Sequence, residues 1–173
     1  MKKLLVVVDM QKDFIDGALG TSEAVDIVDP TVQEILSFDG DIVYTLDTHF
    51  ENYLLSAEGK KLPVTHCVKG TAGWEIDNKI KTAFENKNIE PIAFEKFTFG
   101  SLELGEYIKT KGYDYVQFVG LCTDICVISN VLITKACCPE ITISVKADCC
   151  AGVTKESHNN ALQAMKMCQI DII

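Results

Sequence analysis

The feature that most constrains this chain is an alternation of short apolar, β-branched runs with segments of helical pattern. Six runs have the composition of strands: KLLVVVD at 3–9, DIVYTLD at 41–47, PIAFEK at 91–96, YVQFVG at 115–120, EITISVKA at 140–147 and QIDII at 169–173. The segments between them with helical pattern are 23–37, 74–86, 101–111, 123–136 and 155–168. Runs that are apolar at nearly every residue are typical of parallel strands buried on both faces. The alternation predicts an α/β fold, a three-layer α/β/α sandwich with a six-stranded, mainly parallel sheet.

Length and charge narrow the class of protein. The 173 residues contain no internal repeat and no linker, so we expect one domain over residues 1–173. The net charge of −9 argues against a nucleic-acid partner, because nucleic-acid binding needs clustered Lys and Arg. No apolar stretch approaches the roughly 20 residues of a membrane span, and the run LLVVV before Asp9 is shorter than the core of a signal peptide. We therefore expect a cytoplasmic protein with no membrane partner.

The chain has eight cysteines, a number that would suggest a disulfide framework in a short secreted protein. Without an export signal we expect them to be free thiols. Neither doublet, at 137–138 or at 149–150, has the CxxC spacing of a zinc knuckle. The default interpretation of any one of these residues is a small buried hydrophobe.

Polar residues follow the predicted strands at the edge of the sheet where ligands bind. In an open parallel sheet this edge is formed by the carboxyl ends of the strands. The residues at the five ends are Asp9, Asp47, Lys96, the segment GLCTDIC at 120–126, and Asp148. The topology therefore predicts that carboxylates, an ammonium group and a thiol meet at one edge.

Cys126 falls in the first turn of the helix predicted to begin near Thr123. Unpaired backbone N–H groups in such a turn, and an ammonium such as that of Lys96, would lower the pKa of a thiol. A carboxylate such as that of Asp9 could accept the thiol proton, which makes a Cys–Asp–Lys arrangement chemically coherent. The alternative is that Cys126 packs in the core, Asp9 caps a turn and Lys96 is solvated.

The segment 48–73 is too long and irregular for an ordinary connection, and such loops are usually functional. With the residue before it, this segment supplies Asp47, His49, Glu58 and His66. Two imidazoles with carboxylates are suitable ligands for zinc, iron or manganese. The alternative is a pair of exposed loop histidines.

Five blocks of sequence together resemble the isochorismatase-like cysteine hydrolases, and within them the nicotinamidases. The blocks are VVVDMQKDF, DTH, HCVKGTAGWE, FEKFTFGS and VGLCTDICV, in this order over nearly the whole chain. The resemblance implies an isochorismatase-like, Rossmann-like fold.

The resemblance also implies roles for individual residues. Its catalytic triad falls on Asp9, Lys96 and Cys126, with Cys126 as the nucleophile. Its oxyanion hole falls on the backbone amides of Cys122 and Cys126, with a cis peptide bond between Leu121 and Cys122.

The metal site implied by the resemblance falls on Asp47, His49 and His66, with Glu58 placed as a further ligand. We expect a divalent metal there, with zinc favoured over iron or manganese. Phe14 matches a position that lines the substrate pocket, and Trp74 is a further candidate taken from the loop.

The implied reaction is hydrolysis of a small heteroaromatic amide, nicotinamide above all, through a thioester on the cysteine. The alternatives are another small amide, carbamoyl compound or ureide; isochorismate, which has no evident need of the metal loop; and a non-catalytic thiol redox sensor. Leu62 stands where the family often has a tryptophan, so the exact amide stays open. We expect a homo-oligomer, because the family commonly assembles from identical subunits.

Overall fold

Six parallel strands form one sheet in the order β3-β2-β1-β4-β5-β6. The computed structural model describes all of residues 1–173. The strands are β1 (Lys3–Val8), β2 (Asp41–Asp47), β3 (Ile92–Lys96), β4 (Tyr115–Leu121), β5 (Thr142–Ala151) and β6 (Asp171–Ile172). The predicted six-stranded sheet is confirmed, and every pairing in it is parallel. The order places β1 and β4 side by side at the centre, so their carboxyl ends lie in the middle of the ligand-binding edge.

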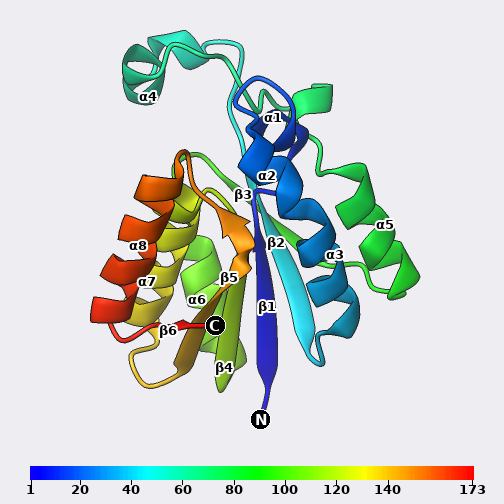
Figure 1. The fold of residues 1–173 in the computed structure, drawn as a ribbon, viewed down its shortest axis with the longest axis vertical. Coiled ribbons are helices and arrows are strands. Elements are labelled where there is room, and N and C mark those ends of the chain that lie inside the picture. Colours follow the sequence, from blue (N-terminus) through cyan, green and yellow to red (C-terminus); the bar gives the residue numbers. More distant parts are fainter.

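Helices cover both faces of the sheet (Figure 1). They are α1 (Lys12–Ile15), α2 (Ser22–Asp26), α3 (Val28–Ser37), α4 (Ala57–Lys61), α5 (Asn78–Asn86), α6 (Leu102–Lys111), α7 (Ile128–Cys137) and α8 (Lys155–Met167), with short helical turns η1 (Tyr53–Leu55), η2 (Ala72–Trp74) and η3 (Thr123–Val127). One face carries α6, α7 and α8, and the other carries α2, α3 and α5, which gives the predicted three layers. No helix has both the length and the apolar character that a membrane crossing requires.

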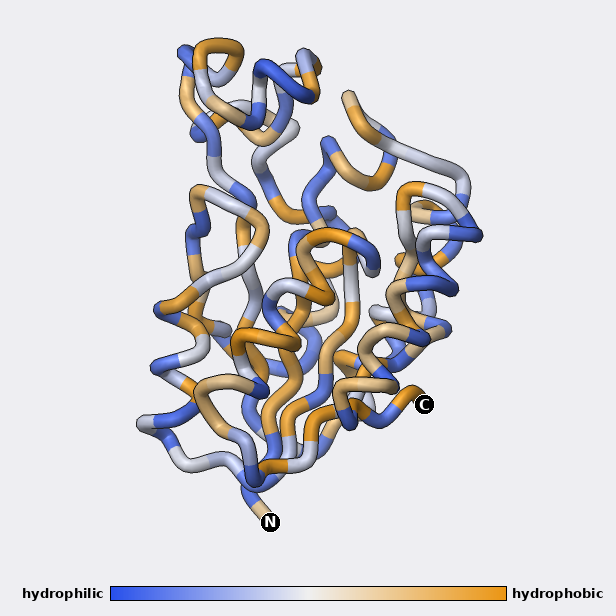
Figure 2. The backbone as a smooth tube through the Cα atoms, turned by 90° about the vertical axis from the view of Figure 1, so that its left-hand side faces the viewer, coloured by the Kyte–Doolittle hydropathy of each residue, from blue (hydrophilic) through white to orange (hydrophobic).

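The central strand β1 shows how the sequence builds two cores. Its residues from Leu4 to Val8 are all fully buried. Leu4, Val6 and Val8 pack in the cluster on the α7 side, whereas Leu5 and Val7 pack in the cluster on the α3 side. Successive side chains of a strand point to opposite faces, so a strand covered on both sides must be apolar throughout. Figure 2 accordingly shows hydrophobic stretches of backbone running through the middle of the molecule.

The helix predicted over 23–37 is two helices, α2 and α3, separated at Ile27. Proline lacks an N–H and its ring clashes with the carbonyl of the residue four positions earlier. Pro30 therefore sits in the first turn of α3, where its missing N–H needs no partner within the helix, and α3 does not continue back into α2. The helix predicted over 123–136 likewise begins differently, with the π-helical turn η3 before α7.

Strand β5 is longer than predicted and continues to Ala151. Asp148 was expected at a strand end, but it lies within β5 with its side chain exposed. The predicted place of Asp148 at the ligand-binding edge is therefore wrong. The cysteine doublet 149–150 belongs to the buried end of this strand.

A register shift in the β4–β5 pairing lies between Phe118 and Gly120, just before the cysteine-containing turn. Gly120 has a φ of +116°, and a Cβ atom there would overlap the carbonyl oxygen of Val8. A residue with a side chain is excluded both by the backbone conformation and by the neighbouring strand.

Replacing Gly120 with alanine should therefore lower the free energy of unfolding by at least about 3 kcal/mol, because it adds left-handed strain to overpacking. Gly112 is the matched control, since it has a φ of +64° but open space around its missing Cβ. Gly112→Ala should cost about 1 kcal/mol. Urea denaturation measures both, and equal losses would show that the close approach to Val8 is unimportant.

Candidate active site and metal site

Lys96, the last residue of β3, joins the polar residues at the carboxyl edge of the sheet. Its Nζ lies 2.6 Å from Asp9 Oδ2, 3.1 Å from Asp47 Oδ1 and 3.4 Å from Cys126 Sγ. Nζ also donates a hydrogen bond of 3.3 Å to the carbonyl oxygen of Thr98. The Lys96 side chain is only 1% exposed. The structure thus brings together the four strand-end residues predicted from the topology, other than Asp148.

Asp9 directly follows β1 and has a φ of +46°. Its backbone N–H donates to the hydroxyl oxygen of Thr45, and the Thr45 hydroxyl donates to Asp9 Oδ1 at 2.6 Å. These two bonds hold the carboxylate so that Oδ2 faces Lys96. Asp9 therefore lies in the core of the site and does not merely cap a turn.

Burial controls the proton affinities of this cluster. Burial raises the pKa of the Cys126 thiol well above its ordinary value, and the opposing effect of Lys96 is smaller. Burial also raises the pKa of Asp9, although Lys96 opposes this shift. Burial disfavours the charged form of Lys96, but Asp9, Cys126 and Asp47 outweigh it and raise the Lys96 pKa. The lowering effect of Lys96 on the Cys126 pKa is therefore present as predicted, but burial outweighs it and the pKa is raised in the free protein.

The turn after β4 carries both cysteines of GLCTDIC. The peptide bond between Leu121 and Cys122 is cis, as the resemblance implied. The Cys122 carbonyl oxygen accepts hydrogen bonds from the N–H groups of Ile125 (3.1 Å) and Val127 (3.0 Å), which closes η3. Burial raises the pKa of Cys122 to about 12, so its thiol is neutral near pH 7.

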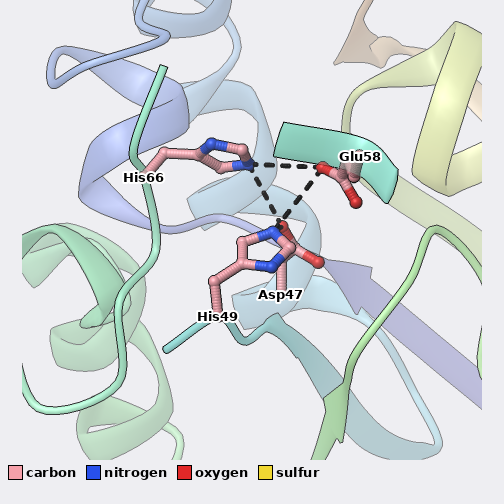
Figure 3. A group of neighbouring side chains, drawn as sticks. All are labelled: Asp47, His49, Glu58 and His66. Atoms are coloured by element: carbon pink, nitrogen blue, oxygen red, sulfur yellow. Dashed lines mark ion pairs between the residues drawn. The ribbon is translucent and has the colours of Figure 1, made fainter. Parts of the chain in front are cut away.

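Asp47, His49, Glu58 and His66 form a second cluster, shown in Figure 3, which could hold a divalent metal ion. Each residue offers one ligand atom, and these atoms all lie within 4.8 Å of one another. Asp47 Oδ2 is 2.9 Å from His49 Nε2 and 3.5 Å from His66 Nε2. Glu58 Oε1 is 3.6 Å and 3.7 Å from the same nitrogens. The two histidines are buried and convergent, so they are not exposed loop residues.

The chemistry of this donor set fits a cation. His66 Nδ1 lies 2.7 Å from the carbonyl oxygen of Val64, which selects the tautomer with a bare Nε2 facing the cluster. His49 Nε2 is buried and has no hydrogen-bond partner of acceptable geometry, despite its short distance to Asp47. Burial opposes ionisation of Asp47, but the neighbouring His49 and His66, with the charge of Lys96, lower its pKa. A carboxylate beside two buried imidazole side chains is a typical ligand set for zinc and related ions.

A cavity of about 330 Å³ opens onto both clusters. Its walls include Cys122 and Cys126 from the turn, Asp47, Glu58 and His66 from the metal cluster, and the predicted Phe14. The remaining lining residues are mostly apolar: Leu19, Thr21, Ala24, Leu62, Phe99, Leu121, Ile125, Gly152 and Val153. The cavity therefore combines an apolar wall for a ring with a thiol and a candidate metal site.

Trp74 does not line this cavity. Its indole N–H donates to the Thr48 hydroxyl at 2.9 Å, and its ring lies in a separate groove beside α5. The structure thus corrects the expectation that Trp74 is a pocket residue. Phe99 does line the cavity. It lies three residues after Lys96, in a turn whose backbone path could not be predicted from the sequence.

Gln11 is a site residue that the sequence reasoning missed. It is fully buried, and its amide brackets the backbone of Asp47: Oε1 accepts from the Asp47 N–H at 2.7 Å, and Nε2 donates to the Asp47 carbonyl at 2.9 Å. Nε2 also donates to the carbonyl of Trp74. The sequence signal that could have identified Gln11 is its position two residues after Asp9, in a turn at the ligand-binding edge of the sheet.

Comparisons with known proteins show what this chain is similar to. The isochorismatase domain family model matches residues 3–173. A nicotinamidase of Acinetobacter baylyi is 29% identical over 150 residues, which cover 71% of this chain and 70% of the relative. The crystal structure of a pyrazinamidase of Pyrococcus horikoshii in complex with zinc is 26% identical, with a TM-score of 0.82 over 100% of this chain and 99% of that one. The structure of a nicotinamidase/pyrazinamidase, PncA, from Bacillus subtilis has a TM-score of 0.88 over 99% of each chain, at 23% identity.

Replacing Lys96 with methionine should lower the free energy of unfolding at pH 7 by about 3–5 kcal/mol, because it leaves buried carboxylates without their cation. Since Lys96 lowers the pKa of Asp9, its loss raises that pKa further. A carboxyl group with a raised folded-state pKa destabilises only above its unfolded value, so the deficit should be small near pH 4 and grow towards pH 7. Urea denaturation across this range measures it.

Lys69→Met is the matched control, because Lys69 pairs with Glu95 at the same 2.6 Å but is 45% exposed. It should cost no more than about 1 kcal/mol. A Lys96 variant as stable as this control would contradict the role assigned to the buried ammonium.

His66→Ala should weaken binding of a divalent ion by more than about 100-fold, because it removes a buried ligand nitrogen. Titration calorimetry of the metal-stripped protein with Zn²⁺ or Mn²⁺ measures this. His158→Ala is the control, since His158 hydrogen-bonds Thr123 and lies outside the metal cluster. Equal affinities in the two variants would exclude the cluster as the metal site.

Proposed function

The chain belongs to the isochorismatase family, and from this premise we propose that it is a cysteine amidohydrolase of small heteroaromatic amides, with nicotinamide as the favoured substrate. The observation that carries the proposal is the buried Lys96 ammonium, which lies 2.6 Å from Asp9 and 3.4 Å from the thiol of Cys126, a residue that lines the cavity. The names of the relatives support the choice of amide, since they include a nicotinamidase.

In the first step Asp9 accepts the proton of the Cys126 thiol, and the sulfur attacks the carbonyl carbon of the amide. The raised pKa of Asp9 makes it a stronger base than an ordinary aspartate. Lys96 remains protonated and stabilises the thiolate as it forms. The backbone N–H groups of Cys122 and Cys126 are the proposed donors to the oxyanion.

The second step completes the hydrolysis. Asp9 returns the proton to the amide nitrogen, the C–N bond breaks, and ammonia leaves a thioester on Cys126. Water then adds to the thioester while Asp9 accepts its proton. The C–S bond breaks, Asp9 returns this proton to the sulfur of Cys126, and the carboxylic acid is released. The same carboxyl group thus acts as base and then as acid in each of the two half-reactions.

The metal cluster has a separate part in the proposal. Asp47, His49, Glu58 and His66 would hold a divalent ion, with zinc favoured over iron or manganese. When bound, the ion supplies an electron-pair acceptor for the ring nitrogen of the substrate. Phe14 lies 5.5 Å from His66 between ring centroids, which places an aromatic wall beside this position.

A homo-oligomeric assembly and a cytoplasmic location stay predictions. The runner-up function is hydrolysis of another small amide, carbamoyl compound or ureide, because Leu62, which lines the cavity, stands where the family resemblance leads us to expect a tryptophan.

The wild-type protein should release ammonia from nicotinamide, and Cys126→Ala should lower kcat at least about 1,000-fold because it removes the nucleophile. Cys122→Ala should retain most of the activity, since the proposal uses only the backbone of Cys122. Cys168→Ala, at an exposed thiol, is the control for loss of a cysteine elsewhere.

Ammonia release is measured over a panel of amides, carbamoyl compounds and ureides. Full activity in Cys126→Ala would overturn the mechanism. Cleavage of other members of the panel, but not of nicotinamide, would overturn only the choice of substrate.

A further inference from the structure

Asn130 is a buried polar residue for which the mechanism above has no role. It lies in α7, one helical turn after Cys126, and is 1% exposed. A buried amide is costly unless its polar atoms find partners, so its contacts indicate what it holds in place.

The amide of Asn130 makes three hydrogen bonds to two backbone segments. Nδ2 donates to the carbonyl oxygens of Cys126 (2.8 Å) and Phe99 (3.2 Å). Oδ1 accepts from the N–H of Ser101 at 2.9 Å. Two carbonyl acceptors and one N–H donor allow only this orientation of the amide, because a flipped group would face oxygen to oxygen. Asn130 thus connects the backbone of Cys126 to the loop that follows β3.

This loop, residues 97–101, bears directly on the site. The carbonyl oxygen of Thr98 accepts a hydrogen bond from Lys96 Nζ, and Phe99 lines the cavity. Gly100 packs against Ile133 of α7 so closely that a Cβ atom would overlap its side chain. The loop is therefore docked on α7 by the Asn130 amide and by this close contact.

We infer that Asn130 is a positioning residue, which holds Cys126 against Lys96 through one bond and the Phe99 wall of the pocket through the other two. The inference rests on the proposed function, because it concerns the geometry of the same reaction. The bond to Cys126 acts on the reacting sulfur, and the bonds to the loop act on the substrate wall. The two effects can be separated by the choice of substitution.

Asn130→Val removes all three hydrogen bonds with little change in bulk. It should lower kcat at least about 10-fold, raise KM about 5-fold and slow alkylation of Cys126 by iodoacetamide, because small displacements of reacting groups are costly. Asn130→Thr has the same shape as valine but carries a hydroxyl, which can donate to the carbonyl four residues earlier in a helix. That carbonyl is the one of Cys126, so Asn130→Thr should recover most of kcat and of the alkylation rate while KM stays raised.

Two controls separate positioning from general stability. Val131→Ala removes a fully buried side chain of the same helix outside the site, and Thr134→Val replaces a buried hydroxyl that has no partner one turn further on. Both should keep the wild-type kcat, KM and alkylation rate, even where Val131→Ala lowers Tm as much as Asn130→Val does.

The measurements are steady-state ammonia release, Tm, and alkylation followed by mass spectrometry of the Cys126 peptide. The inference is supported if Asn130→Thr has a kcat close to that of the wild type and a raised KM. The inference would be overturned if kcat, KM and the alkylation rate of Asn130→Val were all within twofold of those of Val131→Ala. It would also be overturned if Asn130→Thr had the same kinetics as Asn130→Val. If Asn130→Val does not fold, the raised KM with near-normal alkylation in Asn130→Thr carries the test.

Alkylation uses no substrate and so distinguishes this inference from the proposed function. A protein that releases no ammonia from any amide in the panel, but shows the predicted pattern of Cys126 alkylation, would overturn the function and retain the positioning role. Normal alkylation and KM in the Asn130 variants of an active amidase would overturn the positioning role alone.

Discussion

The ammonium group of Lys96 is enclosed by two carboxylates and a thiol that come from three other parts of the sheet edge. Asp9 follows β1, Asp47 ends β2 and Cys126 lies in the turn after β4. A buried ammonium is tolerated only where opposite charges and hydrogen-bond acceptors surround it. The requirement to satisfy this one charge therefore fixes how the ends of four strands meet. Asp47 extends the arrangement, since Oδ1 faces Lys96 while Oδ2 faces the histidines of the metal cluster.

The same burial accounts for the resting state of the thiol. Excluding water raises the pKa values of both Cys126 and Asp9, so in the free protein the proton stays on sulfur and Asp9 is paired with Lys96. An exposed cysteine with a lowered pKa would be a ready target for oxidants. A buried neutral thiol beside a strengthened base is instead suited to proton transfer at the moment of attack. This arrangement favours hydrolysis over redox sensing as the task of Cys126.

Features of the fold and site that depend on local sequence could be predicted, whereas features that depend on contacts between distant segments could not. The sheet and the meeting of Asp9, Asp47, Lys96 and Cys126 depend on strand ends, which apolar runs mark in the sequence. The direction of the Cys126 pKa could not be predicted, because it depends on how completely distant segments exclude water. Pro30 explains the break before α3 once the structure is known, although the sequence pattern predicts a single helix over 23–37, and the length of β5 was not predicted either.

Trp74 and Phe99 show the same limit within the pocket. Both are aromatic residues near site motifs, and only backbone paths separate the one that lines the cavity from the one that does not. The role of Asn130 could not be predicted for a related reason. An asparagine in a helix is expected to face solvent, and only the structure shows its buried hydrogen-bond partners.

The segment that carries His49, Glu58 and His66 of the candidate metal cluster also lines the cavity. Glu58 lies on α4, which stands away from the sheet above its carboxyl edge (Figure 1). Leu62, directly after α4, lines the cavity together with Glu58. The two legs of this segment pair through His49 and Val68, and the buried Tyr53 ring packs 4.6 Å from that of His49. An ion bound by all four ligands would therefore join α4 to the end of β2. The candidate metal cluster and part of the cavity wall are thus built by one connection between β2 and β3.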